Sequence, residues 1–185
     1  IQLLTQQICS GTLAVDGNCY QFRAFARDAA VLYPYLNSNV KGMVDYALDV
    51  HKAFNHFWVP VYDEAYQLIN GTINTDVMYN LGTTLMVYAA NQTNAEERYR
   101  WMQGYQRWVE RFTSYTFGTA DGIKIDGTGF HHWTAYDGYM YSFNTACDAT
   151  YYLAGTRFQI KKENYLFLRN AIYAQIVQSN ESGVK

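Results

Sequence analysis

Hydrophobic residues recur every three or four positions along most of the chain, which is the spacing of one face of an α-helix. Prolines interrupt this pattern only at Pro34 and Pro60. Because the residue before a proline is disfavoured in a helix, the pattern predicts helices over 21–33 and 39–58, each ended by a proline. A shorter apolar stretch predicts a third helix over 61–69.

The second half of the chain carries the same spacing in further segments. One helix begins after Thr75, and the next begins at Thr93, where Glu96 three residues later predicts a capping box. Later helices are predicted over 142–153 and 162–178. The fold class is therefore all-α, with helical hairpins stacked as in a bundle, an α-solenoid or an α/α toroid. Periodicity alone leaves these three arrangements open.

One long segment, about residues 117–141, breaks the helical pattern. Connections longer than about 15 residues are uncommon inside compact domains unless they serve a function or are disordered. This segment contains three tyrosines, two histidines, two phenylalanines and a tryptophan, and that composition argues against disorder. It is therefore predicted to be a long ordered loop that carries the function.

Composition and charge narrow the class of partner. The chain has 185 residues, including 18 Tyr, 10 Phe and 4 Trp, and its net charge is −2. A chain with this net charge lacks the basic surface that attracts nucleic acid, so nucleic acid is not expected as a partner. No apolar run approaches the roughly 20 residues that span a bilayer, so no membrane span is expected. Aromatic residues with a polar end suit surfaces that bind sugars or other proteins.

The three cysteines, Cys9, Cys19 and Cys147, have no zinc-ligand spacing. Cys9 and Cys19 form either a disulfide or a pair of free thiols, and the sequence leaves this open. Adjacent histidines usually point apart, so His131 and His132 make a poor metal site. No metal and no cofactor are predicted.

The long loop holds residues that can transfer protons. Histidine titrates near neutral pH, and tyrosine donates a proton when a nearby cation lowers its pKa. The simpler alternative is that these rings pack and bond to the backbone. Three acidic residues, Asp121, Asp126 and Asp137, each precede a glycine, so turn formation already explains them. A glycosidase with two catalytic carboxylates is therefore not favoured.

Residues 122–160 resemble the catalytic-loop region of bacterial chondroitin sulfate ABC lyases, which belong to the polysaccharide lyase family that also holds hyaluronan and chondroitin AC lyases. The flanking helices resemble that family more loosely. The matching motif residues, in order, are Asp126, Gly127, Thr128, Phe130, His131, His132, Tyr136, Gly138, Tyr139 and Phe158.

This resemblance implies β-elimination on an acidic polysaccharide, such as chondroitin sulfate, dermatan sulfate or hyaluronan. It implies that His132 neutralises the uronate carboxylate or takes the C5 proton. Tyr139 is then the acid at the glycosidic oxygen, and also a candidate base. His131, Trp133 and Tyr136 are expected to contact the substrate.

The resemblance also implies that residues 1–185 are one segment of a helical catalytic domain, part of an incomplete α/α toroid. The β-sandwich domains of the family, and an Arg and a Glu that complete its site, are expected outside this segment. We therefore expect the segment to be inactive alone. The substrate class implies that the parent protein is secreted or periplasmic.

Two other functions are consistent with the sequence. In a non-catalytic carbohydrate-binding module, Trp133, Tyr136 and Tyr141 form a stacking platform for sugars. In an interaction scaffold of helical repeats, the aromatic residues are ordinary core. No period of about 34 residues is visible, which disfavours the scaffold.

Overall fold

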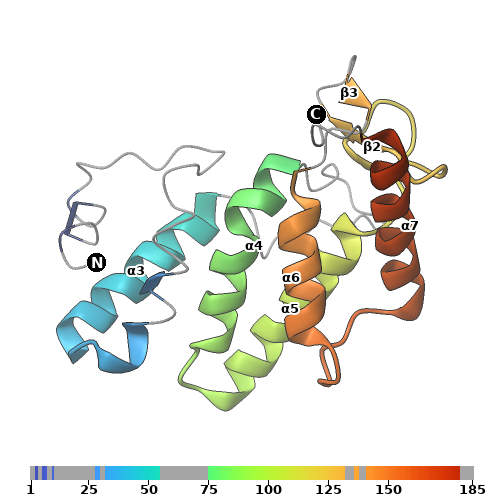
Figure 1. Ribbon diagram of the computed structural model, residues 1–185. Helices are drawn as coiled ribbons and strands as arrows, with labels where there is room; N and C mark the ends of the chain where they lie inside the picture. Colours follow the sequence, from blue (N-terminus) through green and yellow to red (C-terminus); the bar gives the residue numbers. More distant parts are fainter. Residues whose placement is uncertain are drawn as a thin grey trace, which may run out of the picture.

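The structure is a computed structural model that describes residues 32–54, 75–131, 136–137 and 141–179, together with six isolated positions before residue 30. Within these ranges the chain is mostly helical, which confirms the all-α prediction (Figure 1). A short 3-10 helix, η1, spans Tyr33–Tyr35. The α-helices are α3 (Ser38–Phe54), α4 (Thr75–Ala90), α5 (Ala95–Phe112), α6 (Phe143–Leu153) and α7 (Lys162–Gln178).

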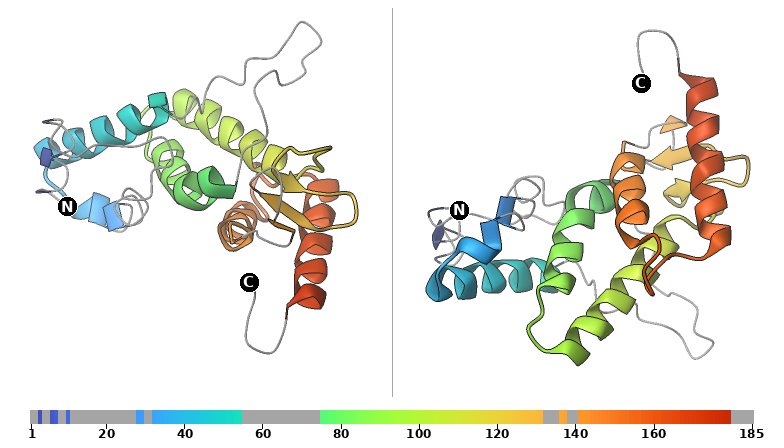
Figure 2. Two further views of the ribbon diagram at one scale, coloured as in Figure 1. Left: turned by 90° about the horizontal axis from the view of Figure 1, so that it is seen from above. Right: turned by 60° about the horizontal axis from the view of Figure 1, so that its bottom comes forward.

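Four of the helices form two hairpins, α4 with α5 and α6 with α7. A short turn over 91–94 joins α4 to α5, and residues 154–161 join α6 to α7. Helix α4 packs against α3, α5 and α6, and both views in Figure 2 show it between them. The approach of α4 to α6 requires Gly82, because a Cβ at this position would lie 2.4 Å from Cγ2 of Thr145. Closure of these hairpins into a toroid stays a prediction.

Two clusters of buried hydrophobic residues hold the hairpins together. The larger one joins α3, α4, α5 and α6, and Val44, Leu85, Tyr105, Val109 and Leu153 lie at its centre. The smaller one lies under the loop between α5 and α6. It consists of Met78, Phe112, Ile123, Phe143, Ala146, Leu168 and Ala171. The start of α4, the end of α5 and the start of α6 therefore meet beneath this loop.

The prediction of a capping box at Thr93 is wrong. Helix α5 is capped by Asn94, whose side-chain Oδ1 accepts hydrogen bonds from the backbone N–H of Glu96 at 2.8 Å and of Glu97 at 3.1 Å. Asn94 satisfies two of the N–H groups that a helix start leaves without partners. Glu96 instead lies 3.5 Å from Arg100, one turn along an exposed face.

The other predicted helices agree closely with the structure where it describes them. The segments predicted after Thr75, over 142–153 and over 162–178 correspond to α4, α6 and α7. The helix predicted over 39–58 is α3, described to Phe54. The helix over 61–69, most of the helix over 21–33, and both Cys9 and Cys19 lie outside the described residues. Cys147 is a half-buried free thiol.

The long loop contains a small antiparallel sheet that the sequence did not predict. Its strands are β1 (Gly122–Ile123), β2 (Gly129–His131) and β3 (Tyr136–Asp137), in the order β1-β2-β3. Gly122 pairs with Phe130, Phe130 with Asp137, and His131 with Tyr136. The loop is ordered in its described part, as expected. None of the helices in the described ranges is long and apolar enough to span a membrane.

Candidate active-site loop

A tight turn connects β1 to β2. Oδ1 of Asp126 accepts hydrogen bonds from the backbone N–H and the hydroxyl of Thr128, at 2.9 and 2.7 Å. These bonds, the backbone bond first, lower the pKa of Asp126. Gly127 has a φ of +88°, and a Cβ there would lie 3.1 Å from the carbonyl oxygen of Asn170 in α7. The turn interpretation of Asp126 is confirmed, and the turn lies against α7.

Lys124 is the lysine of this loop, and acceptors within the loop bind its ammonium group. The ammonium group donates to the hydroxyl of Thr116 at 3.2 Å and to the carbonyl oxygens of Gly118 and Ala120 at 2.9 and 2.5 Å. It also lies 4.7 Å from the centre of the Phe130 ring. Burial lowers the pKa of Lys124 against the opposing effect of Asp121. Three acceptors engage the three ammonium protons, so this lysine holds the loop together.

The central feature of the loop is a buried histidine between two carboxylates. His131, the last residue of β2, is only 3% exposed. Its Nδ1 lies 2.6 Å from Oδ2 of Asp121, and its Nε2 lies 3.6 Å from Oδ2 of Asp76. Both aspartate side chains are about 90% buried, with relative exposures of 10%. An ionised carboxylate only accepts hydrogen bonds, so Nδ1 of His131 is the donor to Asp121.

Further contacts join the loop to α4. The hydroxyl groups of Thr75 and Ser142, both fully buried, share a hydrogen bond. The rings of Tyr79 and Tyr141 meet edge to face at 4.7 Å between centroids. The Tyr141 ring also stands edge-on to the His131 ring, at 6.5 Å. The first turns of α4 therefore contact both β2 and the residues just before α6.

The structure describes two of the five predicted site residues, His131 and Tyr136. His131 was expected to contact substrate, and its side chain is buried against Asp121 and Asp76. Tyr136 lies in β3, with its backbone paired to His131. Three other predicted residues, His132, Trp133 and Tyr139, lie outside the described residues.

Sequence reasoning missed Asp76 and Asp121 as partners of His131. Asp76 lies in the first turn of α4, where a negative charge already complements the helix dipole. Asp121 precedes Gly122, whose φ of +127° suits a turn. No local signal distinguishes either aspartate. Among the described residues, no group of three His, Cys, Asp or Glu side chains has the arrangement of a metal site.

Comparison with known families identifies the chain. The sequence model of the family described as "Lyase, catalytic" matches residues 47–184, well over half of the chain. The chain belongs to this family. The match runs from α3 through the loop to the end of α7, so it includes the buried histidine and both of its partners. The family is a polysaccharide lyase catalytic domain, and the chain is thus a polysaccharide lyase. A search of curated proteins finds no match.

Proposed function

We propose that this chain belongs to the catalytic domain of a lyase that cleaves chondroitin and dermatan sulfate-type glycosaminoglycans by β-elimination. The observation that carries the proposal is the family match across the loop that contains His132 and Tyr139. The resemblance of residues 122–160 to chondroitin sulfate ABC lyases supplies the substrate class.

The reaction needs two proton transfers and charge stabilisation. A base removes the proton from C5 of the uronate, and the C5–H electrons form a double bond between C4 and C5. The C4–O4 bond breaks as this double bond forms, its electron pair leaves with O4, and an acid protonates the departing O4. We assign the acid to Tyr139, and charge neutralisation or proton removal to His132. Positioned acids and bases typically contribute about 10² to 10⁴ in rate.

The two uronate epimers make different demands on this pair. Glucuronate and iduronate carry the C5 proton on opposite faces of the ring, whereas O4 keeps its place. A residue that acts as both base and acid reaches only a proton on the side of O4. We assign this role to Tyr139, and the opposite-face role to His132 or to a residue outside this chain. The parent protein is then expected to cleave both chondroitin and dermatan sulfate.

The test uses the full-length parent protein with each polymer, and follows the ultraviolet absorbance of the unsaturated uronate product. His132→Ala and Tyr139→Phe are expected to lower kcat by about 10² or more each, and His132→Ala to affect one epimer more than the other. Tyr99→Phe in α5 is the matched control and should retain wild-type activity. Wild-type rates in both loop variants contradict the assignment. Cleavage of chondroitin 4-sulfate with intact dermatan sulfate contradicts only the ABC specificity.

We further propose that the parent protein is secreted or periplasmic, because glycosaminoglycans are extracellular. Fractionation of the native cells, with immunodetection of the protein, tests this. Recovery in the cytoplasmic fraction alone contradicts it.

A further inference from the structure

We propose that the first turns of α4 are a platform that fixes both ends of the segment 132–140, and that Asp76, Asp121 and His131 are positioning residues for the elimination. This inference rests on the proposed function, because His132 and Tyr139 both lie in that segment. Asp76, Asp121 and His131 act through these two residues and need not touch the substrate.

The entry to the segment is fixed by the contacts of His131. The two ring nitrogens face carboxylates from different elements, Asp76 in α4 and Asp121 just before β1. The hydrogen bond to Asp121 at 2.6 Å and the longer 3.6 Å contact with Asp76 involve the two different ring nitrogens, and together they restrict rotation of the ring. The backbone of β2 is also paired on both sides, with β1 and with β3. Consecutive Cα atoms lie about 3.8 Å apart, so the position of His131 limits where the next residue of the chain can begin.

The exit from the segment is fixed to the same part of α4. Thr75 bonds to Ser142, and the ring of Tyr79 packs on that of Tyr141. Thr75 and Tyr79 lie on either side of Asp76 in the sequence, within the first two turns of α4. One rigid element therefore holds the residue before His132 and the second residue after Tyr139. Its position sets the spacing of His131 and Tyr141, and the two proposed catalytic residues lie between them in the sequence.

The energetics of the cluster favour a positioning role over a purely stabilising one. Burying charged groups costs free energy that a buried ion pair only partly recovers, so apolar residues of similar size often stabilise a fold equally well. The second carboxylate oxygen of Asp121 is buried and has no hydrogen-bond partner among the described residues. A buried polar atom without a partner lowers the stability of the fold. A buried polar cluster that contains such an oxygen therefore fits a role in geometry better than a role in stability.

The test compares two aspartates of the same loop in the full-length protein. Asp121→Asn keeps the size of the side chain but removes the charge opposite His131. Asp126→Asn is the matched control, because Asp126 is exposed and bonds only within its own turn. A misplacement of about 1 Å can cost on the order of 10² in rate. We therefore expect kcat to fall 10- to 100-fold in Asp121→Asn, with KM within about twofold, and to stay unchanged in Asp126→Asn.

Two companion variants test the rest of the platform. Asp76→Asn weakens the entry contact, and Ser142→Ala removes the exit hydrogen bond. Both should show the same pattern of lowered kcat and retained KM. Thermal melts establish the folded fraction of each variant at the assay temperature. Losses of activity that only follow the unfolded fraction, or an Asp121→Asn variant as active as Asp126→Asn, overturn the proposal.

Hydrogen exchange supplies a readout that does not depend on activity. Amide exchange in peptides covering 132–140 should be faster in Asp121→Asn and Ser142→Ala than in Asp126→Asn and the wild type. Equal exchange in all four proteins overturns the positioning role. Wild-type protein that makes no unsaturated product refutes the proposed function instead, and the exchange result then decides separately whether the platform holds the segment.

Discussion

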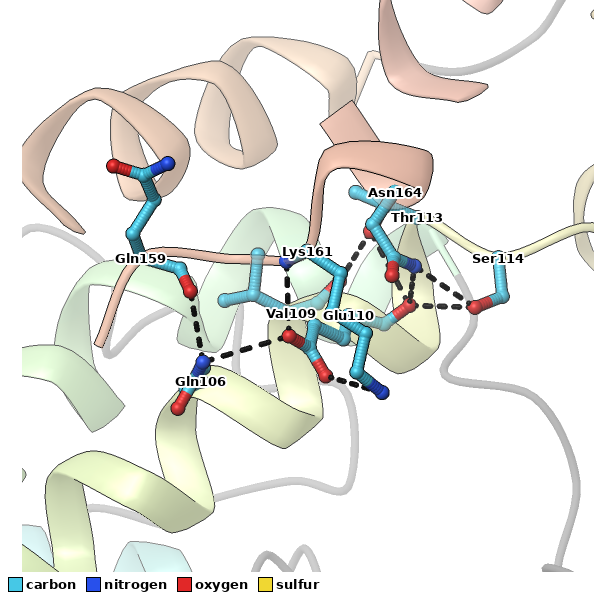
Figure 3. Close-up of polar contacts among 8 residues, drawn as sticks. All are labelled: Gln106, Val109, Glu110, Thr113, Ser114, Gln159, Lys161 and Asn164. Carbon is cyan, nitrogen blue, oxygen red and sulfur yellow. Dashed lines mark hydrogen bonds and ion pairs between the residues drawn. The ribbon is translucent and has the colours of Figure 1, made fainter. Parts of the chain in front are cut away.

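Replacing Glu110 by alanine removes a buried carboxylate from the junction of α5 and α7, which Figure 3 shows. Glu110 is 8% exposed. Its Oε1 accepts a hydrogen bond from the backbone N–H of Lys161 at 3.0 Å, and its Oε2 lies 3.4 Å from the ammonium group of Lys161. Lys161 is the N-cap residue of α7, and its own side chain makes no capping hydrogen bond. The glutamate of one helix thus binds the start of the other.

The two contacts of Glu110 with Lys161 are expected to differ in strength. A hydrogen bond to a charged group contributes about 1.5–3 kcal/mol, and the N–H at a helix start is left without this partner in Glu110→Ala. The Lys161 side chain is 67% exposed, so its ion pair contributes only about 0–1 kcal/mol. We expect Glu110→Ala to lower the free energy of unfolding by about 2–4 kcal/mol, and Lys161→Ala by no more than about 1 kcal/mol.

Urea unfolding followed by far-ultraviolet circular dichroism measures these differences. Glu110→Gln is the informative intermediate, because its amide oxygen can still accept from the Lys161 N–H without the charge. At roughly 2–4 °C per kcal/mol for a chain of this size, Glu110→Ala should lower Tm by about 4–16 °C. If Lys161→Ala costs as much as Glu110→Ala, the exposed ion pair rather than the buried backbone contact joins the helices. The reasoning is then refuted.

Three further substitutions test the packing and the electrostatics. Gly82→Ala should destabilise the fold by about 1–3 kcal/mol in urea unfolding, because its Cβ would meet Thr145 at 2.4 Å; a gain in stability would contradict the close packing of α4 on α6. Tyr105→Phe should leave the free energy of unfolding within about 1 kcal/mol of wild type or raise it, since the buried hydroxyl has no hydrogen-bond partner among the described residues. A larger loss of stability would show that the hydroxyl makes a stabilising contact. Burial, with a hydrogen bond to Asp45, raises the pKa of Tyr33 from 10.0 to about 12. A raised pKa gives stability that is complete below pH 10 and is lost toward pH 12, so Tyr33→Phe should show a shallower alkaline loss than wild type, and equal slopes would refute this.

Helices were predictable because their signals are local. The apolar spacing over 162–178 predicted α7, and the same spacing predicted α4 and α6. The start of α5 shows the limit of this approach, because Thr93 and Asn94 are both good N-cap residues. Only the position of the side chains shows that Asn94 reaches the N–H groups. The strands were missed because two or three residues are too few to display an alternating pattern.

The buried cluster was not predictable, because it depends on contacts between distant parts of the chain. Asp76 is explained locally by the helix dipole, and Asp121 by its turn, so neither suggested a role at the site. Packing of α4 under the loop brings Asp76 to His131, and the pairing of β1 with β2 brings Asp121 there. The same packing buries the histidine that the resemblance had suggested for substrate contact. Its neighbour His132 remains the proposed catalytic histidine.

The central claim, that the parent protein cuts glycosaminoglycans by elimination, is tested most directly by the products it makes in water labelled with heavy oxygen. Purified full-length protein is incubated with chondroitin sulfate in this water, and the oligosaccharides are analysed by mass spectrometry. Elimination gives products with an unsaturated uronate at the new non-reducing end and without label introduced at the cleaved bond. Saturated products that carry one heavy oxygen at that bond would show hydrolysis and contradict the account.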